Sequence, residues 1–184
     1  METRMDLLDA PSSSVATLDR LRVVRPVGAT ETPVDAPDIL VIDLAEATDP
    51  LRLCREVARQ TPATAIIGVG DEDRLADGFQ LLRLGAVSWA EDEVALGAVL
   101  DIVASGGSSI ARRHASWLLA DFAEIAGRQH HADPRYTVTA TEREVLTRLG
   151  KGQTPEEIAD FHDVETHLVN RQVRLALTRF HRRR

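Results

Sequence analysis

The sequence predicts an α/β fold with a parallel sheet in its N-terminal half and an all-α domain at its C-terminal end. Strand-like apolar runs alternate with helix-like periodicities between residues 38 and 105, which is typical of parallel strands joined by helices. Three short helical patterns with Gly-bearing or polar turns follow between residues 138 and 180. With 184 residues, 43% of them hydrophobic, the chain can form two small packed domains.

The elements of the first half follow from the apolar pattern. The run Asp38-Ile39-Leu40-Val41-Ile42-Asp43-Leu44 predicts a central strand that is covered on both faces. The pattern after it predicts a helix around 51–59, a strand at 65–69, a helix around 74–84, a short strand at 86–90 and a helix around 93–105. Before it, two more strands could lie at 5–8 and 22–27, around a short helix.

Two helices of the second half begin with clear N-terminal signals. Thr139 precedes Glu142 by three residues, and in such a capping box each side chain satisfies a backbone N–H of the other residue. Thr154 is followed by a proline and an acidic first turn, which faces the positive end of the helix. The residues expected to face the core are Val145, Leu146 and Leu149 in the first helix, and Ile158, Ala159 and Phe161 in the second.

The third helix, about 165–180, separates an apolar side from a polar side. Its expected core residues are Val169, Val173, Ala176 and Phe180. The opposite side carries hydrogen-bond donors and no carboxylate; its residues are His167, Asn170, Arg171, Arg174 and Thr178. A helix with such a face suits contact with an anionic surface.

This three-helix run resembles the LuxR/NarL-type helix-turn-helix DNA-binding domain. The family's opening is matched by Thr139, Glu142, Arg143, Glu144, Val145 and Leu146, and its middle by Gly152, Thr154, Glu157, Ile158 and Ala159. The third helix departs from the family, because Glu165, Leu168 and Gln172 stand where the family has Ser, Thr and His. The chain given ends at Arg184, before the fourth helix through which the family's domains often pair.

The resemblance implies that the third helix docks in the major groove of DNA. Arg171 or Arg174 would then pair with guanine O6 and N7, and Asn170 with adenine. His167 and Gln172 are expected to contact phosphates. The basic tail with Arg182 and Arg183 is either a further phosphate contact or a solvated chain end.

The net charges of the two parts of the chain have opposite signs. Residues 137–184 hold 9 Lys and Arg against 7 Asp and Glu, a formal charge of +2, whereas residues 1–136 carry 13 against 22, a formal charge of −9. DNA phosphates would therefore attract the C-terminal part and repel the rest. The overall isoelectric point of about 5.4 argues against indiscriminate coating of nucleic acid.

Residues 3–105 resemble the receiver domain of two-component response regulators. The resemblance is carried by the stretches 37–44, 84–89 and 104–108, the last of which leads into a helix at 111–126. It implies a flavodoxin-like, doubly wound parallel sheet. It also implies that Asp43 occupies the phosphoacceptor position.

The rest of the phosphorylation chemistry is missing. The receiver family holds Mg²⁺ with a pair of acids, but here Asp9 is followed by alanine, and Gly70 stands where a hydroxyl is needed. Acids at 91–93 replace the lysine that neutralises the phosphoryl group, and Lys151, in the C-terminal domain, is the only lysine of the chain. We interpret residues 1–108 as a pseudo-receiver in which Asp43 has a structural role.

No enzyme, cofactor or metal site is expected. His130, His131 and Asp133 fit a solvated linker better than a metal site, because they lie in a polar segment that ends in proline. Cys54 lies at helical spacing with apolar residues and is expected to be a buried small hydrophobe rather than a reactive thiol. No nucleophile stands beside a base in a recognisable motif.

We therefore expect a cytoplasmic transcription regulator with no transmembrane segment: a degenerate receiver at 1–108, a connecting helix and linker at 109–136, and a helix-turn-helix DNA-binding domain at 137–184. Arginine at 21 of 22 basic positions suggests a GC-rich bacterial genome. Its partner would be double-stranded DNA, bound as a homodimer or as a heterodimer with a related regulator. One alternative is an interaction protein that titrates a partner regulator, for which Leu168 and Leu175 offer an apolar edge. Another is a pseudo-receiver that senses a small-molecule ligand.

Overall fold

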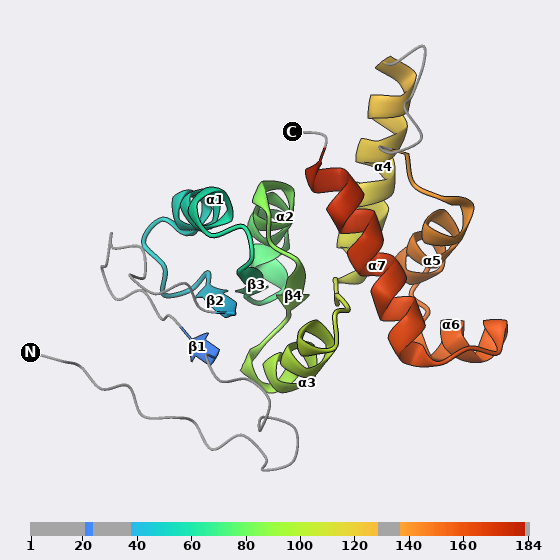
Figure 1. Cartoon of the computed structure of the whole chain (residues 1–184), viewed down its shortest axis with the longest axis horizontal. Coiled ribbons are helices and arrows are strands. Elements are labelled where there is room, and N and C mark those ends of the chain that lie inside the picture. Colours follow the sequence, from blue (N-terminus) through green and yellow to red (C-terminus); the bar gives the residue numbers. More distant parts are fainter. Residues whose placement is uncertain (1–20, 24–37, 129–136, 183–184) are drawn as a thin grey trace, which may run out of the picture.

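The computed structural model of the chain describes residues 21–23, 38–128 and 137–182 (Figure 1). Within these residues the sheet has four parallel strands in the order β1-β2-β3-β4. These strands are β1 (Leu21–Val23), β2 (Ile39–Asp43), β3 (Ala65–Val69) and β4 (Ser88–Ala90). The predicted parallel α/β sheet is thus confirmed. The strand order of the described part does not reverse as it does in a doubly wound sheet, so this finer arrangement stays a prediction, and the strand expected at 5–8 lies outside the described residues.

Helices cover both faces of the sheet. Helix α1 (Pro50–Gln60) and helix α2 (Leu75–Leu84), which follows the short 3-10 helix η2 (Glu72–Arg74), pack on the face that carries Leu40 and Ile42. Helix α3 (Glu93–Ala104) packs on the face that carries Ile39 and Val41. Successive residues of a strand point to opposite faces, so the continuous apolar run of β2 serves both layers, as expected.

Short-range signals fix where the helices of this layer begin. Asp49 caps α1 by accepting from the backbone N–H of Arg52 at 3.0 Å, and proline holds the first helical position. Asp92 caps α3 in the same way, with 2.7 Å to the N–H of Ala95. Asp71 caps η2 by accepting from the N–H of Arg74 at 3.2 Å, so the acidic run at 71–73 starts this short helix.

The described residues of the C-terminal half form four helices: α4 (Arg112–Arg128), α5 (Ala140–Gly150), α6 (Pro155–His162) and α7 (Thr166–His181). The predicted capping box of Thr139 with Glu142 is present, and Thr154, which was predicted to start the next helix, forms a second capping box with Glu157. One expected core residue is wrong: Phe161 is 63% exposed. It lies near the C-terminal end of α6, and the Arg148 guanidinium covers its ring at 3.7 Å.

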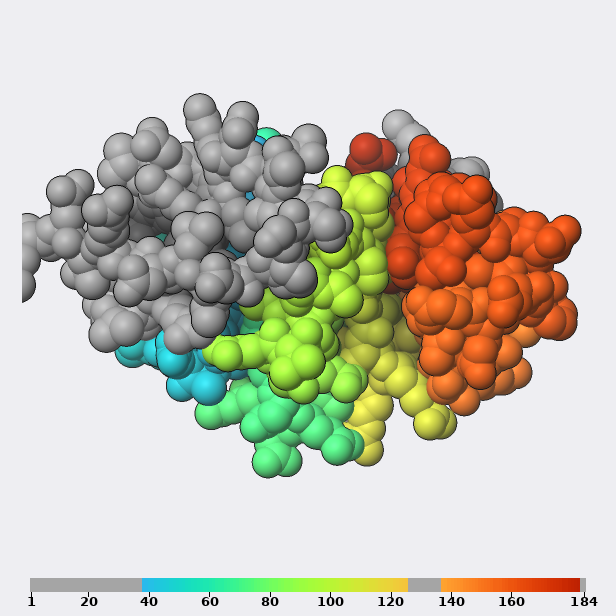
Figure 2. All heavy atoms as spheres, turned by 90° about the horizontal axis from the view of Figure 1, so that it is seen from below, coloured from blue at the N-terminus to red at the C-terminus, as the bar shows by residue number. Residues whose placement is uncertain are grey.

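Helix α4 joins the two halves in one hydrophobic core. Its residues Ala115, Leu118 and Phe122 are buried in a cluster that includes side chains of β2, α1, α2, α5, α6 and α7. Figure 2 shows α4, in yellow, between the α/β layer and the orange C-terminal helices. The expected domain boundaries near residues 108 and 136 remain predictions, because the described core continues across them.

Burial shifts the pKa values of two side chains that pack near α2. Burial raises the pKa of the Cys54 thiol to about 12, so this side chain is a neutral small hydrophobe, as the sequence predicts. His114 of α4 is fully buried between aromatic rings, and its Nε2 atom lies 2.8 Å from the Leu75 carbonyl oxygen. Burial lowers the pKa of His114 from 6.5 to about 4.

None of the helices in the described residues is both long and apolar enough to cross a membrane.

The buried His114 should make the protein less stable in mild acid. Between pH 6.5 and about 4, His114 is protonated in the unfolded chain but stays neutral in the folded chain. The free energy of unfolding therefore falls as pH falls through this window. The loss is up to about 3 kcal/mol. Urea unfolding of wild type and His114→Phe at pH 7 and pH 4.5 measures it, and the variant should lose less stability than wild type. The exposed His167→Phe serves as the control; equal pH slopes in wild type and His114→Phe would contradict the assignment.

Candidate nucleic-acid interface

The turn between α6 and α7 sets the angle at which α7 leaves the core. Asp163 adopts a left-handed conformation with φ 53° and ψ 48°, and the N–H of Val164 donates to the Ala159 carbonyl at 3.0 Å. Asp is one of the few non-glycine residues that accept this conformation. The turn is therefore tight enough to pack α7 against both α5 and α6, as in a helix-turn-helix.

A buried stripe and one ion pair orient α7. Its expected core residues are all buried, together with Leu177; they are Val169, Val173, Ala176 and Phe180. On one edge of the stripe, the Arg179 guanidinium lies 2.9 Å from the carboxylate of Glu142, which is 1% exposed and also forms the capping box of α5. The α7 face opposite this stripe is thereby turned away from the core.

Several predicted DNA-contacting residues do lie on the outer side of α7. Arg171, His167 and Arg182 are exposed, and Gln172 is half-buried. The His167 ring lies 2.9 Å from the carboxylate of Glu165, the N-cap residue. Arg183 lies outside the described residues.

Asn170 does not face outward, so this part of the prediction is wrong for the described conformation. It is 7% exposed, and its backbone carbonyl oxygen accepts from the backbone N–H of Ser108 at 3.0 Å. A Cβ atom added to Gly107 would lie 2.9 Å from the Cβ of Asn170, so the two backbones approach closely. The physical reason is the docking of the segment after α3 against this flank, which the periodicity of α7 alone does not include.

Arg174 lies on the same flank, one turn further along. It is half-buried, and its Nη1 atom has no hydrogen-bond partner among the described residues. Burial lowers the pKa of this guanidinium from its ordinary value, which means that the charged form is poorly solvated. The buried Ser108 hydroxyl also lacks a partner in the described structure.

A second polar contact joins the C-terminal end of α7 to the α/β half. The His181 Nε2 atom lies 2.7 Å from the Leu82 carbonyl oxygen at the end of α2. Asn170, Arg174 and His181 are spaced along one flank of α7. The α/β half, which lies beside α7 in Figure 1, thus contacts this flank, whereas Arg171 is exposed.

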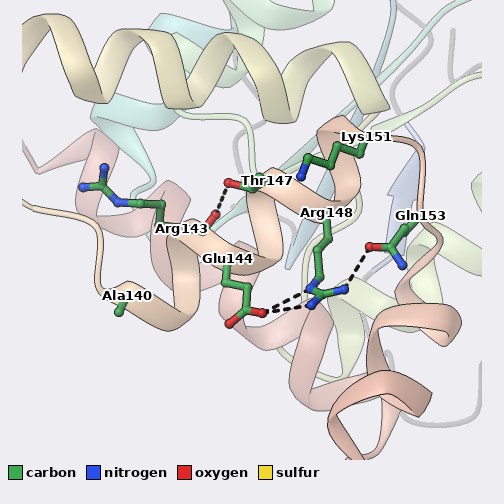
Figure 3. A pocket seen from close by; sticks show the side chains of 7 residues that line it. All are labelled: Ala140, Arg143, Glu144, Thr147, Arg148, Lys151 and Gln153. Carbon is green, nitrogen blue, oxygen red and sulfur yellow. Dashed lines mark hydrogen bonds and ion pairs between the residues drawn. The ribbon is translucent and has the colours of Figure 1, made fainter.

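A basic hollow on α5 was not predicted from the sequence. It has a volume of about 440 Å³, and its lining residues are Ala140, Arg143, Glu144, Thr147, Arg148, Lys151 and Gln153 (Figure 3). Glu144 and Gln153 hold the Arg148 side chain at 3.1 and 3.2 Å, whereas Arg143 and Lys151 have no side-chain partner in the described structure. The spacing of Arg143, Thr147 and Lys151 at every fourth residue was the signal available in the sequence.

Asp43 makes a local hydrogen bond that stabilises the turn after β2. At the end of β2, its Oδ1 atom accepts from the N–H of Ala45 at 2.8 Å. Asp92, in the acidic stretch where a receiver requires lysine, caps α3 instead. The described residues contain no group of three or more His, Cys, Asp or Glu side chains that could hold a metal ion, and the segment with His130, His131 and Asp133 lies outside them.

No family model matches the sequence, and no curated protein is significantly similar to it. Among solved structures, the chain is similar to the response regulator RcsB of Salmonella typhimurium, with 18% identity over 79% of this chain and 70% of that chain and a TM-score of 0.37. A structure of two RcsB dimers bound to two parallel DNAs gives 18% identity, coverage of 80% and 74%, and a TM-score of 0.37. The response regulator ChrA of a heme-sensing two-component system gives 20% identity, coverage of 80% and 76%, and a TM-score of 0.36. TM-scores of this size carry no argument about the function of this chain.

Proposed function

We propose that the protein is a transcription regulator that binds promoter DNA through α7. The observation that carries this proposal is the position of Arg171, which is exposed on the side of α7 opposite the buried stripe of Val169 and Val173. Arginine at such a position can donate two hydrogen bonds to guanine O6 and N7 in the major groove. The residues of α7 itself include no carboxylate that would repel the duplex.

Further cationic groups support binding to the phosphate backbone. Arg182 is exposed at the end of α7, and Arg143 and Lys151 on α5 have no side-chain partner among the residues that the structure describes. The net charge of −9 on residues 1–136 keeps the α/β half away from the duplex. This distribution favours one docking orientation, with the C-terminal helices toward the DNA.

The α/β half would control access to DNA without phosphoryl transfer. In the described conformation it covers Asn170 and Arg174, so these side chains reach bases only after α7 separates from Ser108 and Leu82. The poorly solvated Arg174 charge disfavours the closed arrangement, whereas the apolar core around α4 favours it. DNA would shift this balance because it contacts Arg174 only in the open form.

The direct test is selection of duplexes from a random pool by the full chain, followed by substitution of Arg171. We expect an enriched motif that contains a guanine. Arg171→Ala should lose about 1–3 kcal/mol of binding free energy on this motif and relax the preference at that guanine, measured by fluorescence anisotropy.

Arg182→Ala is the matched control, because a phosphate contact should weaken all duplexes equally and reduce the salt dependence of binding. If no motif is enriched and Arg171→Ala binds like wild type, base reading by α7 is wrong.

Opening of the α/β half can be tested at Gly107. A methyl group there would meet the Cβ of Asn170 at 2.9 Å and Ile102 of its own half at 3.0 Å. Separation of α7 relieves the first of these clashes, so Gly107→Ala should weaken the closed contact and raise DNA affinity by about five-fold or more. Gly97→Ala is the control, because a Cβ atom at that position meets nothing within 4 Å. Equal affinity of both variants and wild type would contradict the proposed covering role.

Control without aspartyl phosphorylation gives another test. Incubation of the protein with a small-molecule phosphodonor and Mg²⁺ should add no phosphate, as measured by intact mass. Asp43→Asn should bind DNA like wild type, since the Asp43 carboxylate accepts a local backbone hydrogen bond, from Ala45, and has no other partner among the described residues. A stoichiometric, acid-labile adduct at Asp43 would refute the pseudo-receiver interpretation.

A second candidate function is an interaction protein that titrates a partner regulator or forms a heterodimer with it. The observation that favours it is apolar exposure at the α6–α7 corner, where Phe161 is 63% and Val164 42% exposed. A small-molecule sensor is a weaker candidate, supported by a hollow at the carboxyl ends of β3 and β4 that Glu72, Glu91, Arg112 and Arg113 help to line. Both candidates predict that the random-pool selection enriches no motif for the purified protein alone.

A further inference from the structure

We infer that Leu168 and Leu175 are specificity-determining residues that contact the methyl groups of thymines on either side of the guanine read by Arg171. This inference rests on the proposed DNA-binding function and specifies the base sequence that the site takes. It concerns the two leucines of α7 that the packing of the protein leaves exposed.

The three side chains share one face of α7. Leu168 and Leu175 are seven residues apart, close to two helical turns, so they point in nearly the same direction. Arg171 lies between them along the axis and is turned from Leu168 by about 60°. All three are exposed in the described conformation, at 36% for Leu168 and 38% for Leu175, so no opening of the α/β half is needed to present them.

The spacing of the side chains fits the spacing of bases. Seven residues of α-helix rise about 10 Å, which equals about three base steps of 3.4 Å. A helix lying along the groove would therefore place Leu168 and Leu175 near bases about three steps apart, with Arg171 between them. The thymine C5-methyl is the apolar group that base edges present in the major groove, and apolar side chains contact it.

A second copy of the chain fits this face less well. In a two-fold symmetric contact through the two leucines, Arg171 of one copy would lie close to Arg171 of the other, and Arg182 adds a further positive charge at the end of the helix. Two like charges brought out of water repel each other. Duplex DNA offers guanine acceptors and phosphates to these arginines and methyl groups to the leucines, so the charge of the face selects DNA as its occupant.

The experiment begins with the motif selected from a random pool by the full chain. We expect thymines about three base pairs apart, with a guanine between them. Replacement of either thymine by deoxyuracil removes only the methyl group and should weaken binding about four-fold, the equivalent of one buried methylene. Replacement of thymines elsewhere in the same duplex is the control and should change nothing.

Substitution of the leucines assigns each methyl group to its residue. Leu168→Ala should abolish the effect of deoxyuracil at one thymine and keep the effect at the other, and Leu175→Ala should do the reverse. Both positions are exposed, so far-UV circular dichroism should show wild-type folding for both variants.

Three outcomes would overturn the inference. A motif with the guanine but without sensitivity to deoxyuracil would refute the role of the leucines and leave the proposed function standing. Leucine variants with unchanged base preference but altered oligomer mass, measured by light scattering, would assign the leucines to a protein contact. A pool without any enriched motif would remove the proposed function and this inference together.

Discussion

The position of α7 depends on the burial of α4 between the α/β layer and the C-terminal helices. His114 packs edge-on against Trp89 with ring centroids 5.4 Å apart, whereas Phe122 packs against Phe180 of α7 with ring centroids 5.6 Å apart. One helix thus contacts both halves through different side chains. Because packed interiors allow little sliding, α4 fixes which flank of α7 lies against Ser108.

As a consequence, the contact between α7 and the α/β half is well packed, but some of its buried polar groups lack hydrogen-bond partners. The Arg174 Nη1 atom and the Ser108 hydroxyl are buried without partners in the described structure, and each such group opposes closure. The backbone bond from Ser108 and the His181 bond to Leu82 favour it. A ligand that interacts with Arg174 only when α7 is separated from the α/β half would shift the equilibrium toward the open arrangement. DNA binding could therefore be controlled without a phosphoryl group.

The sequence predicted local structure well because local rules decide it. The strand at 65–69, the helix starts at Thr139 and Thr154 and the buried stripe of α7 follow from periodicity and end signals, and the structure has them. The position of Asn170 was wrong because its burial comes from residues 107–108, more than sixty positions earlier in the chain. Phe161 was misplaced for a similar reason, since its ring packs on Arg148 of another helix at the surface. Such contacts depend on how elements dock, which helical periodicity does not contain.

Hydrogen–deuterium exchange of the full chain, with and without a saturating selected duplex, reports directly on the DNA contact of α7 and on its separation from Ser108. We expect slower exchange in the first half of α7, where DNA would shield it. We also expect faster exchange of the Ser108 amide, because its bond to the Asn170 backbone carbonyl breaks when the α/β half separates. If DNA binds and exchange stays unchanged in α7 and at Ser108, then α7 does not contact the DNA and the α/β half does not separate from it.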